Sequence, residues 1–341
     1  MRISTVGAIV AVLVAGVAGQ ASAGYDQPRP IPKHVLAPYF QAYLPGDPGD
    51  LAEKSGARYL NLSFLHTNKP GECEVYWNGV PAAQPGYLEG IAKIRRNGGD
   101  VIPAFGGAYA GETHTEIADS CADIDAIAAA YQKTVTTYNV SRLDMDIEGD
   151  SLYNTAAIDR RNKALRKAQD WAKGQNRPLE IVYTIGTGPH EPNLDGIKLV
   201  RNAIENGVDV RMVNIMTFDF FDNKQHDMAQ DAMTAGEALV KQLKELYPSK
   251  SNAQLWNMVG ITAMVGLDDY GANGETGPKE VFTPANAIEV TVWAWLKGIG
   301  QLSFWALARD NGNCPGEHKE DCSGVEQAPW QYTRTMRLFT H

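Results

Sequence analysis

Residues 141–149 read SRLDMDIEG, and acidic and apolar side chains alternate along the stretch with a period of two. Successive side chains of a β-strand point to opposite faces, so Asp144, Asp146 and Glu148 share one face and the apolar residues between them share the other. Because the apolar face can pack against helices, the acidic face must point to the inside of a closed sheet. The stretch therefore predicts an inward-facing central strand with three carboxyl groups in a row.

The rest of the chain alternates short β-rich runs with longer helical stretches. Strands are predicted at residues 35–40, 58–65, 100–105, 142–148, 180–185, 210–217, 258–263 and 301–307. Helices are predicted at residues 123–138, 155–173, 196–206, 228–246 and 284–298. Eight strands, each followed by a helix or a long connection, predict an α/β fold, a single-domain (β/α)₈ TIM barrel. An open doubly wound sheet is the alternative, but no Gly-rich phosphate loop follows the first strand.

The three carboxyl groups of the 141–149 stretch also indicate a function. Like charges this close cannot all ionise freely, so we expect at least one raised pKa. A carboxylic acid with a raised pKa is what general-acid catalysis near neutral pH requires, and Glu148 lies nearest the carboxyl end of its strand, where barrel active sites are found. One alternative is a solvated edge strand, which the apolar alternation argues against. The other is a divalent cation site, but the strand carries no histidine and the chain no phosphate-binding loop; we expect neither metal nor cofactor.

Composition and charge narrow the class of protein. Among 341 residues, 44% are hydrophobic and 21% are charged, which is typical of a soluble globular protein. A net charge of −9 offers no electrostatic basis for binding nucleic acid. Residues 1–23 fit a signal peptide, with Arg2, an apolar run and an Ala-Ser-Ala cleavage site. We expect a secreted, extracellular monomer with one domain at residues 24–341; the alternative, an uncleaved membrane anchor, would need a longer apolar run.

Four cysteines follow the predicted signal peptide. In an oxidising compartment an even count indicates two disulfides. Cys314 and Cys322 lie in one loop rich in Gly and Pro and are expected to pair, which leaves Cys73 for Cys121. Because no Cys-x-x-Cys motif is present, we expect a structural role for all four rather than a zinc site.

Four segments, taken together, resemble the motifs of the family 18 glycoside hydrolases, the chitinases. LDMDIE at 143–148 matches the last three acids of the family's D-x-x-D-x-D-x-E signature, with Ser141 where the first Asp is usual. AFGG at 104–107 resembles the family's S-x-G-G, MTFD at 216–219 its M-x-Y-D, and SFW at 303–305 its eighth strand. The resemblance runs from about Ala37 to the C-terminus. It is closest to the small single-domain secreted chitinases of streptomycetes and filamentous fungi.

The resemblance implies a retaining mechanism in which the substrate's own 2-acetamido oxygen attacks C1 and forms an oxazolinium. It implies that Glu148 is the general acid and base and that Asp146 orients the acetamido group. Asp144 would lie deeper and share a proton with Asp146. The implied partners are chitin and chito-oligosaccharides. The remaining implied substrate-binding positions are Met216, Phe218, Asp219, Trp305, whose ring would floor the sugar subsite, and Gly107, which would permit close backbone approach.

Phe218 is the main departure from the family pattern, because the family's Tyr donates its hydroxyl to the acetamido group. Tyr183 or Tyr39 would compensate if its side chain points inward. The short segment 265–283 leaves no room for the α+β insertion of larger members, which predicts an open cleft and internal cleavage. The favoured function is thus an endo-acting chitinase (EC 3.2.1.14). A non-catalytic chitinase-like lectin that binds chito-oligosaccharides and an endo-β-N-acetylglucosaminidase acting on N-glycans remain as alternatives.

Overall fold

The computed structural model describes residues 28–81, 86–190, 194–271 and 274–340. The signal peptide predicted at residues 1–23 lies outside the described residues. Within the described ranges, no helix combines the length and the apolar character needed to cross a bilayer.

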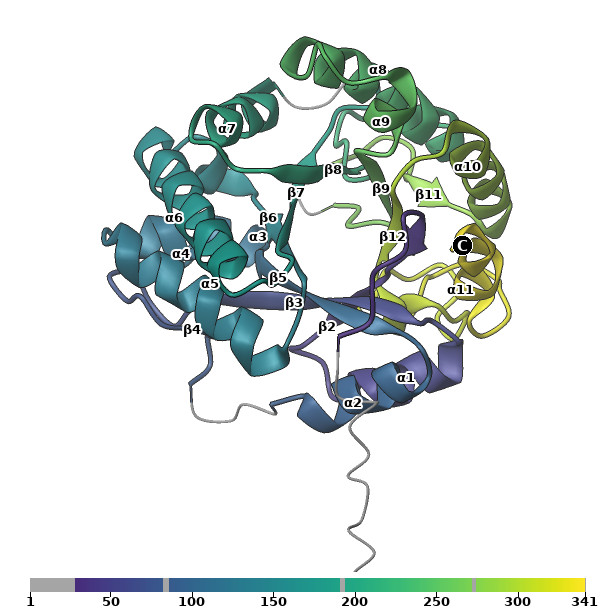
Figure 1. Cartoon of the computed structure of the whole chain (residues 1–341). Coiled ribbons are helices and arrows are strands. Elements are labelled where there is room, and N and C mark those ends of the chain that lie inside the picture. Colours follow the sequence, from purple (N-terminus) through teal and green to yellow (C-terminus); the bar gives the residue numbers. More distant parts are fainter. Residues whose placement is uncertain (1–27, 82–85, 191–193, 272–273, 341) are drawn as a thin grey trace, which may run out of the picture.

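Parallel strands form a closed ring at the centre of the structure, and helices surround it (Figure 1). The neighbour order is β1-β12-β9-β8-β7-β6-β5-β3-β2. The ring closes because the first predicted strand is split in two at Pro38: β1 pairs with β12, and β2 pairs with β3. The ring strands are β1 (Val35–Leu36), β2 (Tyr39–Gln41), β3 (Tyr59–Thr67), β5 (Asp100–Gly106), β6 (Arg142–Asp146), β7 (Glu180–Gly186), β8 (Val210–Met216), β9 (Val259–Met264) and β12 (Gln301–Trp305). This arrangement is the predicted (β/α)₈ barrel.

The helical shell follows the strands in chain order. Its longer helices are α1 (Pro48–Ser55), α2 (Leu88–Arg96), α5 (Ile124–Tyr138), α6 (Thr155–Gly174), α7 (Leu194–Glu205), α8 (Met228–Leu246) and α10 (Pro284–Lys297). The shorter elements are α3 (Ala108–Glu112), α4 (Ile117–Ser120), α9 (Asn252–Trp256), α11 (Gln331–Met336) and β4 (Val75–Trp77), which pairs with β3. The five predicted helices correspond to α5, α6, α7, α8 and α10.

Local sequence signals set the ends of several helices. The Asp123 side chain accepts hydrogen bonds from the backbone N–H groups of Asp125 and Ala126, which caps α5. Thr283 and Asn286 form a capping box at the start of α10, and Gly298 ends that helix in the left-handed conformation, with φ of 73°. These caps satisfy backbone groups that the helices themselves leave unpaired.

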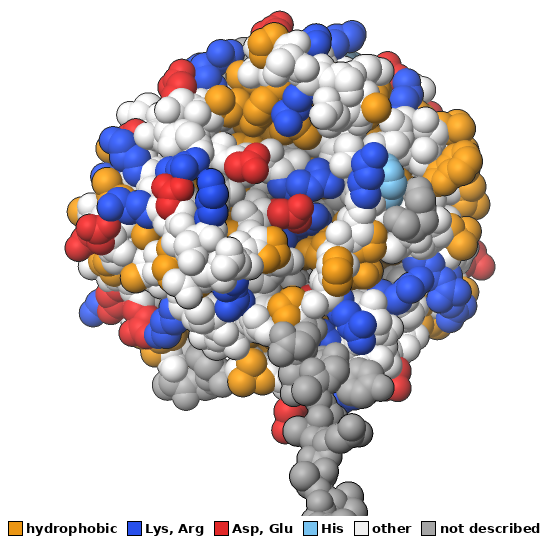
Figure 2. Space-filling view, in the orientation of Figure 1, with side chains coloured by type: hydrophobic (Ala, Val, Ile, Leu, Met, Phe, Trp, Pro, Cys, Tyr) orange, Lys and Arg blue, Asp and Glu red, His pale blue; other side chains and the backbone are white. Residues whose placement is uncertain are grey.

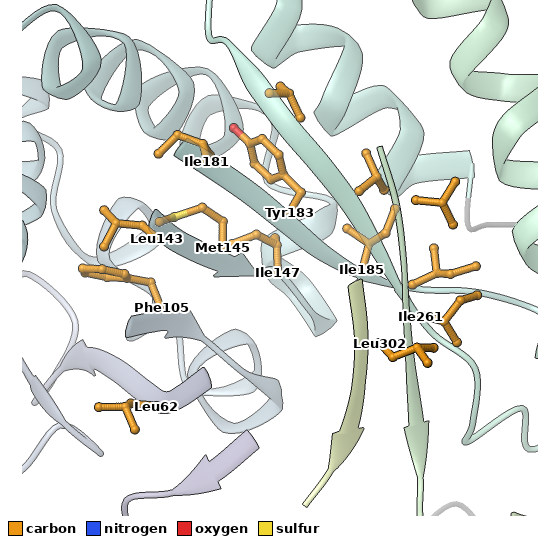
Figure 3. Close-up of a cluster of buried hydrophobic side chains, with 14 of the residues drawn as sticks. Leu62, Phe105, Leu143, Met145, Ile147, Ile181, Tyr183, Ile185, Ile261 and Leu302 are labelled. Carbon is orange, nitrogen blue, oxygen red and sulfur yellow. The ribbon is translucent and has the colours of Figure 1, made fainter. Parts of the chain in front are cut away.

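The apolar side of β6 joins the core between the ring and the helices. Leu143, Met145 and Ile147 are fully buried there, and Figure 3 shows them on the same side of the strand, with Phe105 and Tyr183 nearby. The predicted alternation is therefore present: the apolar residues of the 141–149 stretch face the helices, which leaves its acids for the barrel interior.

Two disulfides stabilise loops of the barrel, and both predicted pairings are confirmed. Cys73 and Cys121 link the segment after β3 to the end of α4. Cys314 and Cys322 close a loop that follows β12.

The segment between β9 and α10 is as small as the sequence predicts. In its described part, a two-stranded antiparallel ribbon of β10 (Gly266–Leu267) and β11 (Val281–Phe282) is present and no α+β insertion. On the face drawn in Figure 2, acidic and basic side chains are interspersed, with both signs near its centre.

Candidate active site

Strand β6 brings its acids to the carboxyl end of the barrel. The strand ends at Asp146, two residues earlier than predicted, but the backbone stays extended through Glu148, with φ of −132° and ψ of 171°. The N–H of Ile147 still donates to the carbonyl of Thr184 on β7, at 3.0 Å. The side-chain alternation therefore continues past the end of the strand, and Asp146 and Glu148 both reach a cavity.

The cavity has a volume of about 510 Å³ and lies where strands β3, β5, β6, β8, β9 and β12 end. The rings of Phe64 and Trp305 stack in its wall, with centroids 5.6 Å apart and planes 11° from parallel. The lining residues are Tyr43, Phe64, His66, Asn78, Gly106, Ala108, Tyr109, Asp146, Glu148, Met216, Phe218, Asp219, Met264, Asp269, Trp305 and Glu320. A flat aromatic surface beside carboxyl groups suits a sugar ring, which has apolar faces and polar edges.

Two glycines allow the backbone to approach the acids closely. A Cβ at Gly106 would lie 2.0 Å from the carbonyl oxygen of Asp146, and one at Gly107 would lie 2.6 Å from the ring of Phe64. Both glycines also have positive φ values, 99° and 86°. Gly107 therefore packs closely behind Phe64 and does not itself line the cavity. This is the close backbone approach that the sequence suggested for this glycine.

Asp144 lies beneath the cavity and is fully buried. Its two carboxylate oxygens accept hydrogen bonds from the hydroxyl groups of Tyr39 and Thr184, both at 2.7 Å. Asn214 donates to Thr184 at 3.0 Å and extends this network across the barrel interior. Burial raises the pKa of Asp144 to about 6, and the two hydroxyl donors and the charge of Arg142 oppose that rise.

Asp146 and Glu148 lie two residues apart on the same face of the extended backbone at the end of β6, and both line the cavity. Burial, followed by the charges of Glu148 and Asp144, raises the pKa of Asp146 well above its ordinary value. Burial also raises the pKa of Glu148 to about 7, although hydrogen bonds from Asp146 and from the N–H of Ala108 lower it. Asp146 therefore lies between two carboxyl groups whose charges both oppose its ionisation.

This pair has the features of an acid–base site. One oxygen of Asp146, Oδ1, is buried and has no hydrogen-bond partner among the described residues. Asp146 lines the cavity beside Glu148, so its carboxyl group borders the space that a bound molecule would fill. Glu148, with a pKa near neutrality, is able to give up a proton and take one back.

Asp219 completes the acidic wall of the cavity from the loop after β8. Its backbone is left-handed, with φ of 54°. Its Oδ1 accepts the N–H of Asp269 at 3.3 Å, and its own N–H donates to Asp268 at 3.4 Å. Burial, then the charge of Asp269, raises the pKa of Asp219 to about 8. At neutral pH this carboxyl group is therefore largely protonated and able to donate a hydrogen bond.

The structure brings together most of the residues predicted from the sequence. Met216, Phe218, Asp219 and Trp305 line the cavity with Asp146 and Glu148. The two tyrosines proposed to compensate for Phe218 do not line it.

Tyr183 faces the helices: it is fully buried in the outer core and its hydroxyl donates to Asn162 of α6 at 2.5 Å (Figure 3). As a substrate-binding residue it was wrongly predicted, because residues of β7 alternate and its neighbour Thr184 takes the inward position. Tyr39 points inward, but its hydroxyl is fully buried against Asp144.

Sequence reasoning missed the outer wall of the cavity, which loops distant in sequence contribute. Tyr43 follows β2, and its hydroxyl donates to Glu320 at 2.6 Å. Glu320 lies in the loop closed by the Cys314–Cys322 disulfide, and Asp269 contacts His318 of the same loop at 2.8 Å. The predicted disulfide indicated that this loop has a fixed shape. The spacing of its cysteines did not indicate that the loop lies at the site. Within the described ranges, no group of three or more His, Cys, Asp or Glu side chains is arranged to hold a metal ion.

Comparison with known proteins agrees with this geometry. Residues 35–310 match the family described as "Glycosyl hydrolases family 18". A probable bifunctional chitinase/lysozyme of Escherichia coli is 32% identical over 295 residues, and endochitinase 11 of Metarhizium anisopliae is 31% identical over 294 residues. Each alignment covers 82% of this chain, which spans 31% of the first relative's length and 53% of the second's.

Solved structures extend the comparison to three dimensions. Active domain 2 of a thermostable chitinase from Pyrococcus furiosus, studied as catalytic-site mutants with chito-oligosaccharides, superposes with a TM-score of 0.77 at 28% identity. The match covers 91% of this chain and 96% of that one. With the family match, the sequence relatives and the shared barrel in agreement, this chain is a member of glycoside hydrolase family 18.

Proposed function

We propose that this protein is an endo-acting chitinase that hydrolyses β-1,4 linkages between N-acetylglucosamine units with retention of configuration. The observation that carries the proposal is the presence of Asp146 and Glu148 side by side in a cavity walled by the Phe64–Trp305 stack. A lectin has no need of an acid whose pKa lies near 7. A sugar-binding surface alone would be served by the aromatic wall.

The mechanism assigns one task to each acid. Glu148 protonates the leaving glycosidic oxygen, and the substrate's acetamido oxygen attacks C1 to give an oxazolinium. The carboxyl group of Asp146, which lines the cavity, accepts the acetamido N–H and stabilises the positive charge that develops on that nitrogen. Glu148, now a carboxylate, takes a proton from the water that opens the oxazolinium ring.

Asp144 supports these steps from below. Two hydroxyl donors hold it as a carboxylate at neutral pH. Its negative charge opposes ionisation of Asp146 in the free protein and helps to offset the positive charge of the oxazolinium. Asp219, protonated near neutrality, supplies a hydrogen-bond donor to the cavity from the loop after β8.

Internal cleavage is the favoured mode of attack. The segment between β9 and α10 contributes a small ribbon in its described part, so it builds no high wall over the cavity. A chain of sugars could therefore extend past the site at both ends. We also propose, from residues 1–23 and the two disulfides, that the protein acts outside the cell.

The second candidate is a non-catalytic lectin for chito-oligosaccharides. Phe218 favours it, because this residue lines the cavity without the hydroxyl that the family's Tyr carries. The lectin and the enzyme differ in one measurable respect, since only the enzyme turns over its ligand.

Substitution of Glu148 by Gln tests the assignment. We expect Glu148→Gln to lower kcat on soluble chito-oligosaccharides by a factor on the order of 10²–10⁴ while the melting temperature stays within a few degrees of wild type. Glu89→Gln, an exposed change on α2, is the matched control and should have no effect. Near-wild-type turnover by the Glu148 variant would refute the assignment. Binding of oligosaccharide by a wild-type protein that does not cleave it would establish the lectin instead.

A further inference from the structure

The loop that carries Asp219 has an unfavourable backbone conformation. Asp219 and Phe221 both have left-handed φ values, 54° and 53°, and neither is a glycine. Left-handed backbone is unfavourable for L-residues, so such a loop needs external contacts to hold it. The ribbon of β10 and β11 supplies those contacts.

Two buried carboxyl groups of this ribbon face the loop backbone. Glu280, which precedes β11, accepts the N–H groups of Phe220 and Phe221 on separate oxygens, at 3.1 and 3.2 Å. Asp268, which follows β10, accepts the N–H of Asp219 at 3.4 Å. We call Asp268 and Glu280 the carboxyl pair. It therefore holds three consecutive N–H groups of the loop.

The members of the carboxyl pair lie side by side on the ribbon, where the N–H of Asp268 donates to the backbone carbonyl of Glu280 at 3.4 Å. Glu280 uses both carboxyl oxygens to accept backbone N–H groups of the loop. Burial, then the hydrogen bond to Glu280, raises the pKa of Asp268 to about 9. Both side chains are buried, at 4% and 7% exposed, and neither lines the cavity. Any effect that they have on the reaction is therefore transmitted through the loop that carries Asp219.

We propose that Asp268 and Glu280 are positioning residues that set the placement of the Asp219 carboxyl group for glycosidic cleavage. This inference rests on the proposed function, because it assigns Asp219 a part in the reaction. The carboxyl pair accepts three consecutive N–H groups of the loop, and this geometry fixes both the left-handed turn and the side chain that leaves it.

The protonated state of Asp268 gives the proposal a sharp test. Asparagine has the same shape as a neutral aspartic acid: its NH₂ can donate to Glu280 and its oxygen can accept the N–H of Asp219. Asp268→Leu keeps the branched shape and the number of side-chain heavy atoms and removes every polar atom of the side chain. Glu280→Gln leaves one acceptor oxygen where two N–H groups need one each. The carboxyl pair therefore predicts opposite outcomes for substitutions of similar size.

We expect Asp268→Asn to keep kcat on soluble chito-oligosaccharides within about twofold of wild type. Asp268→Leu and Glu280→Gln should lower kcat by on the order of 10- to 100-fold, since a displaced catalytic-site group can cost that much. Their affinity for an uncleaved oligomer, measured in the Glu148→Gln background, should change by less than about threefold, because the aromatic wall is untouched. Asp170→Asn, at an exposed ion pair on α6, is the matched control for loss of a carboxylate.

Amide hydrogen exchange gives a readout that does not depend on catalysis. A peptide containing residues 218–222 should exchange slowly in wild type and Asp268→Asn, and faster in Asp268→Leu and Glu280→Gln. Failure of the wild type to cleave chito-oligosaccharides would refute the proposed function, whereas this exchange pattern would still report on the carboxyl pair.

Two results would overturn the proposal: wild-type kcat in Glu280→Gln, or a loss in Asp268→Asn equal to that in Asp268→Leu. If Asp268→Leu or Glu280→Gln fails to fold, Asp268→Ser or Glu280→Asp takes its place. Each keeps a polar group but shortens its reach, so wild-type kcat in the replacement would count equally against the proposal.

Discussion

Removing the hydroxyl of Tyr39 should shift the acid limb of the pH–activity profile. The hydroxyl donates to Asp144 at 2.7 Å inside the barrel, and both residues are fully buried. In Tyr39→Phe the ring can keep its contacts with Phe64 and Trp305, whose centroids lie 6.2 and 5.8 Å away. The substitution thus removes a hydrogen bond to a carboxylate without removing the packing around it.

The size of the shift follows from the strength of that hydrogen bond. A hydrogen bond to a charged group contributes about 1.5–3 kcal/mol, and 1.36 kcal/mol corresponds to one pKa unit. Because the donor stabilises the ionised form, its loss should raise the pKa of Asp144 from about 6 by about 1–2 units. The three acids titrate together, so the pKa that rises is the one for loss of the first proton from the group as a whole.

The reaction needs one negative charge in this group, to offset the oxazolinium, and one proton on Glu148. We therefore expect the acid limb of kcat/KM to move up by about 1–2 pH units in Tyr39→Phe. Activity near pH 5 should fall at least tenfold relative to wild type, while activity near pH 7 falls less. Initial rates on a fluorogenic chito-oligosaccharide between pH 4 and 9 would measure both limbs.

Tyr183→Phe is the matched control, because it removes an equally buried hydroxyl from the helix-facing side of β7. Its pH profile should match that of wild type even if its stability falls. An unchanged acid limb in Tyr39→Phe, or an equal shift in Tyr183→Phe, would show that the hydroxyl on Asp144 does not set the ionisation of the site.

Three further outcomes follow from the same contacts. Burial raises the pKa of Glu148 to about 7 and that of Asp219 to about 8, so their contribution to stability is complete below about pH 4 and is lost as the pH rises through 7 and 8. The melting temperature should accordingly fall between pH 5 and 9, and a rise measured by scanning fluorimetry would contradict this. Glu116→Gln breaks a buried ion pair with Arg161, 2.6 Å long, and should lower the free energy of unfolding in urea by about 3–5 kcal/mol; a loss under 1 kcal/mol would argue against it. Trp305→Ala should raise KM about 30-fold, as expected when about 2 kcal/mol of aromatic contact is removed, with kcat less affected; an unchanged KM would exclude stacking.

The alternation of eight short β-rich runs with helical stretches carried the fold prediction. All eight predicted strands are present, because buried parallel strands are read from apolar runs that need no tertiary information. The break at Pro38 and the end of β6 at Asp146 were missed. Each depends on which backbone groups find partners across the ring, and a single sequence does not show that pairing. Helices α1 and α2 lie in stretches to which no helix was assigned.

The inner half of the site was predictable and the outer half was not. Asp144, Asp146 and Glu148 follow from strand alternation, and the resemblance supplied Met216, Asp219 and Trp305. The prediction that Tyr183 binds substrate failed because of side-chain direction. Its neighbour Thr184, one position along β7, takes the inward-facing place. The N–H of Ala108 and the wall residues after β2 and β12 are placed by loops, whose conformation the sequence pattern does not encode.

Because Phe218 has no hydroxyl, the buried carboxyl and hydroxyl groups beneath the cavity matter more for the reaction in this protein than the family motif alone would suggest. Met216, Phe218 and Met264 present an apolar wall at the ends of β8 and β9. Such a wall can enclose an acetamido methyl group but cannot orient its carbonyl by hydrogen bonding. Under the proposed mechanism, orientation then depends on the carboxyl group of Asp146, whose pKa is raised by burial and by the charges of Glu148 and Asp144. Substitutions at the buried hydroxyl donors should therefore affect the chemical step more strongly than their distance from the substrate implies.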